Sequence, residues 1–189
     1  MDSKKLLRYH LLTVITIFLP TAFIWILHHN HISSLILLFL GLLTGTFFLD
    51  ADHFIDWFYL SPDNDESRQA RQLLDSRQYR RLLTFYLDRI HHFHQLLFHH
   101  YFVQIILVLF SFFIFTSSGS AFAMGFMLGL NLHLLVHQIL DFKSDPTRLQ
   151  SWLFSKEDYQ LPQRYLPHYI SAFILINFLF WWLLSNSRL

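Results

Sequence analysis

The chain has 189 residues, of which 53% are hydrophobic and only 14% are charged, and its formal net charge is +1. Soluble domains carry about 25% charged residues, so this composition favours a protein with much of its surface in lipid. The absence of cysteine excludes disulfide bonds, thiolate metal ligands and cysteine nucleophiles. We therefore predict a single membrane-embedded helical domain over residues 1–189.

Five apolar runs predict transmembrane helices, because a helix needs about 17–25 apolar residues to cross a bilayer. The first run contains Pro20, which a membrane helix tolerates as a kink. No small-residue cleavage site follows that run, so we predict a retained anchor and not a signal peptide. Short turns join the first two runs and the third to the fourth as helical hairpins. The predicted spans are residues 11–27, 32–49, 97–115, 121–140 and 170–184.

Two longer polar segments separate the spans, and we predict them as loops at residues 54–93 and 142–168. Residues 61–89 are rich in arginine and carry leucines at helical spacing, which predicts a loop followed by an amphipathic helix at the membrane interface. The predicted fold class is all-α: a polytopic membrane protein of about five transmembrane helices plus an amphipathic interfacial helix.

The positions of the basic residues predict an orientation. Thirteen of the 14 Lys and Arg residues lie in the N-terminus, in 61–89 or in 142–168, and only Arg188 lies elsewhere. By the positive-inside rule, the N-terminus and both loops face the cytoplasm and the C-terminus lies outside. We predict a multi-pass protein of a cell inner (plasma) membrane.

Three clusters of aspartate and histidine lie where apolar spans begin or end. Imidazole and carboxylate ligate zinc, iron and manganese, and such groups are costly at a membrane edge unless they bind something. All three clusters fall on the edge that the basic residues mark as cytoplasmic. Residue type and charge therefore independently predict one metal site there. The clusters are Asp50-x-Asp52-His53, His94-x4-His99 and His133-x3-His137-x3-Asp141.

Helical spacing favours ligation in the cluster that ends the fourth span. Residues four apart differ by about 40° on a helix, so His133, His137 and Asp141 form one stripe. Histidines at i and i+4 can bind one ion, while Asp141 could ligate a second ion or orient an imidazole.

In the cluster that ends the second span, Asp50 and His53 share a helical face, and Asp52 and Asp56 share a neighbouring one. Two carboxylates and an imidazole so close together resemble a site that bridges two cations.

The middle cluster leaves its ligand open. His94 and His99 lie about 140° apart on a regular helix, so they share a site only if the helix begins or bends between them. Spacing alone ranks His99 first and leaves His92 and His94 level. His10 lies near the same membrane edge and could reach the site. His28, His29 and His31 lie on the opposite edge, and we predict them as solvated turn residues.

At these residues the chain resembles the YdjM-like inner-membrane predicted metal-dependent hydrolases, which belong with the zinc phospholipase C and P1-nuclease group. Leu49-Asp50-Ala51-Asp52-His53 matches their Pro-Asp-x-Asp-His motif without its proline. His94 to His99 matches His-x4-His-Ser, with His100 in place of serine. Leu128-Gly129-x3-His133-x3-His137 matches Leu-Gly-x3-His-x3-Asp, with His137 in place of aspartate. The likeness covers residues 45–142.

The resemblance implies zinc as the divalent metal. The ligand types also allow iron or manganese, and we predict one to three ions. The resemblance also implies hydrolysis of a phosphoester, and it favours His94 in the middle cluster. Asp141, one turn after His137, could take over the aspartate's role. The predicted metal ligands are Asp50, Asp52, His53, His94, His99, His133, His137 and Asp141, and Asp52 and Asp141 are also the predicted catalytic residues.

The leading hypothesis is a membrane hydrolase that uses metal-activated water. The lipid bilayer is the expected partner, a phospholipid or another phosphoester the substrate, and no nucleic acid is expected. A carboxylate without a metal, Asp56 or Asp141, could act as base. Nearby arginines could hold an anionic headgroup: Arg80, Arg81 and Arg89.

Two alternatives stay open. A di-iron desaturase-like or hydroxylase-like enzyme would also place histidines at the cytosolic edge, although only His91-His92-x-His94 partly matches its histidine boxes. A non-enzymatic protein that binds or transports metal would need polar residues at mid-membrane depth, and the few candidates are Gln104, Asn131 and Asn177.

Overall fold

The structure is a computed structural model that describes residues 3–89, 98–154 and 160–187. Every regular element within these ranges is helical, so the predicted all-α fold class is confirmed. The long helices are α1 (Ser3–Leu27), α2 (Ile32–Phe48), α6 (Tyr101–Ser117), α7 (Ala121–Ser144) and α9 (Leu166–Ser185). The shorter ones are α3 (Asp52–Ile55), α4 (Asp65–Asp75), α5 (Tyr79–Arg89) and α8 (Pro146–Leu153).

The long helices make this a membrane protein. Three apolar segments of the described chain are long enough to cross a bilayer, at Lys5–Leu27, Ala121–Ser144 and Gln163–Ser185. Two shorter apolar helices, α2 and α6, accompany them. The first helix continues through Pro20 without a break, as the sequence predicts.

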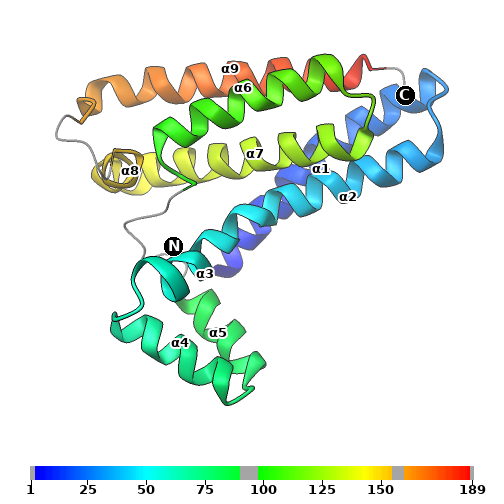
Figure 1. Ribbon diagram of the computed structural model, residues 1–189. Coiled ribbons are helices and arrows are strands. Elements are labelled where there is room, and N and C mark those ends of the chain that lie inside the picture. The colour runs from blue at the N-terminus through cyan, green and yellow to red at the C-terminus, as the bar shows by residue number, and fades with distance from the viewer. Residues whose placement is uncertain (1–2, 90–97, 155–159, 188–189) are drawn as a thin grey trace.

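The long helices lie side by side, and α7 contacts each of the other four (Figure 1). The α1–α2 and α6–α7 pairs form the two predicted hairpins. The N-terminus, α3 and α8 lie at one end of this bundle, here called the site end, and the C-terminus lies at the opposite end (Figure 1).

The closest helix crossing in the bundle joins α2 to α7 and depends on glycines from both helices. A Cβ at Gly45 would overlap the carbonyl oxygen of Phe126, and a Cβ at Gly129 would lie 2.5 Å from the carbonyl oxygen of Leu42. Small residues four apart let membrane helices approach closely, and here each helix carries such a pair. The pairs are Gly41 with Gly45 and Gly125 with Gly129. This crossing fixes the position of α2 against the histidine-bearing half of α7.

The region between the second and third spans differs from its prediction. Residues 61–89 contain two helices, α4 and α5, and not one helix after a loop. The chain reverses between them at Arg77, which has a positive φ of 54°. Glycine is the residue that usually adopts a positive φ, and arginine does not indicate one. The sequence therefore does not predict the turn between α4 and α5. The resulting hairpin extends sideways from the site end of the bundle (Figure 1).

The third apolar helix begins at Tyr101 and not at residue 97, because the chain turns at residues 98–100. The His100 side chain caps this helix by accepting a hydrogen bond from the backbone N–H of Phe102. The helix therefore begins after His99, and His94, the other residue of the predicted middle pair, lies outside the described residues.

Candidate metal centre

Three imidazoles meet at the site end of the bundle. His10 comes from the first turns of α1, and His133 and His137 come from successive turns of α7. One ligand atom from each lies within 4.8 Å of the others. The ring of His133 stacks on both neighbours, with centroids 4.6 Å from His10 and 4.5 Å from His137. Since His10 and His133 are 2% and 0% exposed, these rings are withdrawn from solvent and lipid.

The tautomer of His133 follows from one hydrogen bond. Its Nδ1 lies 2.7 Å from the backbone carbonyl oxygen of Thr46 on α2. A carbonyl oxygen only accepts, so Nδ1 carries the hydrogen and Nε2 presents a lone pair. A histidine that binds a metal through one ring nitrogen commonly donates a hydrogen bond from the N–H of its other ring nitrogen. Because Thr46 follows Gly45 and His133 lies one turn after Gly129, the α2–α7 crossing produces this contact.

His99 faces the same centre from the turn before α6. Its Nε2 lies 3.3 Å from Nε2 of His133, and its Nδ1 lies 3.5 Å from Oδ2 of Asp52. The same Asp52 oxygen accepts a hydrogen bond from the backbone N–H of Phe98 at 2.8 Å. Nε2 of Gln104 donates a hydrogen bond to the backbone carbonyl oxygen of His99. His99 is thus fixed by α3 and α6 with its ring edge toward His133.

His99 presents Nε2 to Nε2 of His133 and Nδ1 to the Asp52 carboxylate, and Nδ1 makes no hydrogen bond within the described residues. A metal cation between the two Nε2 atoms would satisfy both of them. Two nitrogen ligands at about 2.0–2.1 Å from one tetrahedral ion lie about 3.3 Å apart, and the two Nε2 atoms have this separation.

Several buried polar atoms at the centre lack a hydrogen-bond partner among the described residues. They include both ring nitrogens of His10, Nδ1 of His99 and Oδ1 of Asp52, whose residues are 2%, 1% and 1% exposed. Buried polar groups are nearly always paired, and each unpaired one costs about 1–3 kcal/mol. Imidazole nitrogens and a carboxylate oxygen together form a donor set that a divalent cation satisfies. The residues therefore fit a metal ion.

Two carboxyl groups on the outer side of this centre have raised pKa values. Burial raises the pKa of Asp50 to about 7, although a hydrogen bond from Tyr86 opposes the shift. Oδ1 of Asp50 lies 4.0 Å from Nε2 of His133. Burial also raises the pKa of Asp56, which accepts a hydrogen bond from the Ser61 hydroxyl at 2.9 Å. The site end therefore contains carboxyls that are costly to ionise without a counter-charge.

Asp141, at the edge of the centre, has its own partners. One carboxylate oxygen accepts a hydrogen bond from Nε1 of Trp152 at 3.0 Å, and the other lies 3.9 Å from Nε of Arg148. The Trp152 ring meets the ring of His99 edge to face, with centroids 5.6 Å apart. Asp141 therefore positions the tryptophan that packs on His99, and it lies outside the group of three imidazoles.

The structure brings most of the predicted ligands together. Asp50, Asp52, His99, His133 and His137 converge within one network of short contacts. His94 lies outside the described residues, and so does the side chain of His53. The predicted solvated histidines are exposed at the opposite end, where α1 turns into α2; they are His28, His29 and His31.

Two of the three arginines predicted to hold a headgroup, Arg80 and Arg81, are not at the centre. Arg80 and Arg81 are exposed in the first turn of α5, at the tip of the α4–α5 hairpin (Figure 1). The side chain of Arg89 lies outside the described residues.

Three residues at the centre were not among the predicted site residues: His10, Tyr86 and Trp152. A signal existed for His10, because it lies on the same predicted membrane edge as the three clusters. No spacing pattern links it to them, since more than 100 residues separate it from His133. Tyr86 and Trp152 carry no signal that distinguishes them from other interfacial aromatics.

Comparisons with models of known protein families, with curated proteins and with solved structures give no match to this chain.

Proposed function

We propose that the protein is a membrane-bound, metal-dependent hydrolase that acts on a phosphoester, with phospholipids as the natural class of substrate. The observation that carries the proposal is the 3.3 Å distance between the Nε2 atoms of His99 and His133. The Nδ1 atom of His99 faces the Asp52 carboxylate, and the Nδ1 atom of His133 donates to the Thr46 carbonyl oxygen. The reaction class comes from the resemblance of the three motifs to the YdjM-like hydrolases. Zinc is the proposed ion, because nitrogen and carboxylate ligands suit it.

The proposed location is a cell inner membrane with the site end at its cytoplasmic face. This rests on the positive-inside rule and on the position of the N-terminus at the site end of the bundle (Figure 1). A phosphoester in a lipid headgroup lies at the depth where a membrane helix ends, and α7 carries His137 in its last two turns.

The residues that would hold the ion are His10, His99, His133 and His137, joined by Asp50 and Asp52. A divalent cation in such a site lowers the pKa of bound water toward about 7 and polarises a phosphoryl oxygen. The chain supplies the orientation: the Thr46 carbonyl fixes the tautomer of His133. Asp52 orients His99 through Oδ2, and its Oδ1 is the proposed proton acceptor. Asp141 is a positioning residue that acts through Trp152.

The test combines metal analysis with an activity assay. Protein purified without chelator is expected to contain stoichiometric zinc and to hydrolyse phosphatase or phospholipase substrates. Asp52→Asn should lower the rate by about 100-fold or more, because it removes the proton acceptor and the partner of His99. Asp63→Asn, at an exposed loop position, is the matched control and should leave the rate unchanged. Full activity in metal-free protein would refute the proposal.

A structural metal is the second candidate, because the imidazoles come from α1, from the turn before α6 and from α7. An ion bound by all of them would tie these separate segments together. This role predicts stoichiometric metal, no hydrolysis of any phosphoester, and a lower unfolding temperature after the metal is removed.

A further inference from the structure

The α4–α5 hairpin ends in a basic surface. The turn that joins α4 to α5 is the part of the hairpin farthest from the bundle (Figure 1). Three exposed arginines lie at this turn and in the first turn of α5. Together with Gln78 and Tyr79 they line a hollow on the surface. These five residues are here called the basic tip, and its arginines are Arg77, Arg80 and Arg81.

The arginines of the basic tip make no ion pair with a carboxylate of the described residues. Residues 76–87 contain no aspartate or glutamate. Arg81 donates a hydrogen bond to the side-chain oxygen of Gln78 at 2.7 Å, and Gln78 is neutral. By contrast, Nη2 of Arg68, at the start of α4, lies 3.4 Å from Oδ1 of Asp65. The positive charge of the basic tip is therefore available to an anionic partner.

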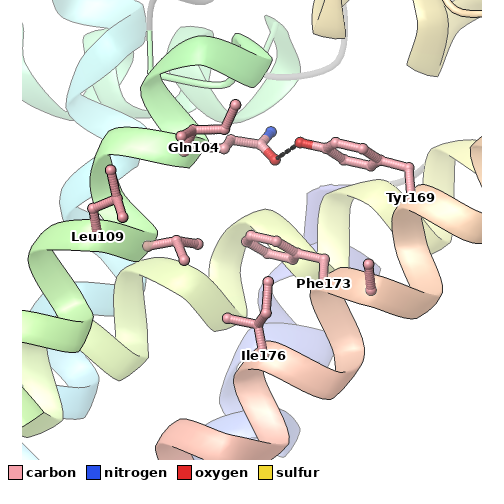
Figure 2. Close-up of a pocket in the computed structure, with 8 residues that line it drawn as sticks. Gln104, Leu109, Tyr169, Phe173 and Ile176 are labelled. Carbon is pink, nitrogen blue, oxygen red and sulfur yellow. Dashed lines mark hydrogen bonds between the residues drawn. The ribbon is translucent and has the colours of Figure 1, made fainter.

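The polar side chains between α6 and α9 lie in a different environment. Oε1 of Gln104 accepts hydrogen bonds from the Tyr169 hydroxyl at 2.7 Å (Figure 2) and from Nε2 of Gln138 at 2.8 Å. These three side chains are neutral and bonded to one another. The guanidinium groups of the basic tip are charged and exposed, so they can bind a ligand from outside the protein.

The position of the hairpin brings the basic tip to the bilayer surface. The chain leaves the bundle after α2 and returns to it at α6, and in between the hairpin extends sideways from the site end (Figure 1). A segment that leaves a membrane-spanning bundle sideways at the end of its helices runs along the surface of the bilayer. An apolar cluster holds the base of the hairpin against α1 and the chain after α2. Its buried members are Leu6, Trp57, Ala70, Leu82 and Tyr86.

Exposed apolar side chains beside the arginines favour a lipid over other anionic partners. Tyr79 and Leu83 are 61% and 58% exposed, and they lie one turn apart on the same face of α5. Interfacial helices combine arginines with apolar side chains that insert among the headgroups, and tyrosine suits that depth. A nucleic acid also offers phosphates to arginine, but its backbone gives Leu83 no apolar surface to pack against.

We propose that the basic tip binds the phosphate groups of anionic phospholipids in the membrane that the bundle spans, with Tyr79 and Leu83 inserted among the headgroups. Arginine binds phosphate through two parallel N–H donors. Each basic residue near an anionic bilayer surface strengthens binding about fivefold, so three arginines together contribute about 100-fold. This interaction holds the hairpin on the membrane surface, and it does not rest on the proposed hydrolase.

The experiment measures how close the basic tip lies to lipid headgroups. Because the chain has no cysteine, Gln72→Cys provides one labelling position, exposed in the last turn of α4. The full-length protein with a fluorophore there is placed in nanodiscs of neutral phospholipid, part of which carries a quencher on its headgroup. Quenching should rise as phosphatidylglycerol replaces the neutral lipid. About 1 M salt should reverse the rise, because it shortens the Debye length to about 3 Å.

Two triple variants locate the effect. Arg77→Gln, Arg80→Gln and Arg81→Gln together should weaken the response to phosphatidylglycerol about 100-fold, so that no rise in quenching remains. The matched control removes the same charge at exposed positions outside the basic tip and should leave the rise unchanged. It combines Arg68→Gln, Lys143→Gln and Arg164→Gln. Both variants should unfold at the wild-type temperature, since all six side chains are exposed.

Three outcomes would overturn the proposal. An equal loss in the two triple variants would show that overall charge, and not the basic tip, attracts the lipid. Equal quenching in neutral and anionic discs would show that the arginines do not select anionic lipid. A fluorophore that ignores phosphatidylglycerol but responds to an added RNA oligonucleotide would identify a nucleic acid as the partner. Since hydrolysis is not measured, each result stands whether or not the protein is a hydrolase.

Discussion

Both ends of the helical bundle carry histidines, and the two ends place them in opposite environments. At the site end, His10 and His133 are buried and their rings stack on each other. At the opposite end, His28, His29 and His31 are exposed in the turn between α1 and α2. The chain's high histidine content therefore indicates nothing by itself. Burial, a fixed tautomer and facing lone pairs distinguish a candidate ligand from a surface residue.

The two ends also differ in how their polar groups are paired. At the opposite end, Nε1 of Trp25 donates to the Leu184 carbonyl, and the Asn30 side chain donates to the Ser187 carbonyl. These bonds tie the α1–α2 turn to the end of α9. At the site end, the buried nitrogens of His10 have no partner among the described residues. At the opposite end hydrogen bonds join α1 to α9, and a buried hydroxyl, that of Ser185, lacks a partner within the described residues. At the site end the described groups without a partner include imidazole nitrogens and a carboxylate oxygen, which fit an added cation.

The largest expected effect comes from removing the central imidazole of the site end. His133→Ala should weaken metal binding by more than about 100-fold, since even changes behind a ligand cost about 10–100-fold. A triple variant, His28→Ala, His29→Ala and His31→Ala, removes three histidines from the other end and should bind metal as the wild type does. Titration of chelator-treated protein with zinc measures both. Equal losses would show that the ends do not differ.

The α2–α7 crossing provides the second prediction. Gly129→Leu would force the helices apart, because even a Cβ there lies 2.5 Å from the Leu42 carbonyl oxygen. We expect a loss of about 1–3 kcal/mol of stability, together with weaker metal binding as the Thr46–His133 bond is lost. The control is Gly119→Leu, toward the opposite end, where a Cβ meets no atom within 4 Å. Thermal unfolding should shift only for the first variant, and equal shifts would contradict the role of the crossing.

The third prediction concerns pH. In the metal-free protein the pKa of Asp50 is raised to about 7, so below that pH the carboxyl holds a proton that a metal must displace. Metal affinity should therefore fall by about tenfold per pH unit below 7 and level off above it. Asp50→Asn should remove this fall between pH 7 and pH 6, because the side chain then has no proton to displace. A pH-independent affinity between 6 and 8 in the wild type would refute this assignment.

The smallest expected effect concerns Trp152, which links Asp141 to His99. Trp152→Phe keeps most of the aromatic packing but removes the hydrogen bond from Nε1 to Asp141. We expect metal affinity to fall about tenfold, as it does when other residues that contact and orient a metal ligand are changed. Trp182→Phe, exposed on α9 toward the opposite end, is the matched control. If both tryptophans behave alike, Asp141 has no positioning role.

Much of this arrangement could be predicted from the sequence, because it depends on local patterns. Apolar runs locate the long helices, and i, i+4 spacing places His133 and His137 on one face of α7. Counting spans predicts that Asp50, Asp52 and His99 lie at the same end of the helical bundle. These inferences need only helical periodicity and span length.

The remaining features depend on tertiary contacts that no local pattern encodes. His10 joins the centre because α1 packs beside α7, and a lone histidine in a first span has no spacing partner. The tautomer of His133 depends on the Thr46 carbonyl, a backbone atom that the α2–α7 glycines bring into reach. The turn at Arg77 contains neither glycine nor proline, the residues that would most clearly predict a turn.

The central claim is that imidazoles of the site end hold a divalent metal ion. The most direct test is X-ray absorption at the zinc edge on protein purified without chelator. We predict a first shell at about 2.0–2.1 Å with the multiple-scattering pattern of at least two imidazoles, and its loss in His133→Ala. Protein without bound metal, or a first shell of oxygen atoms alone, would contradict the claim.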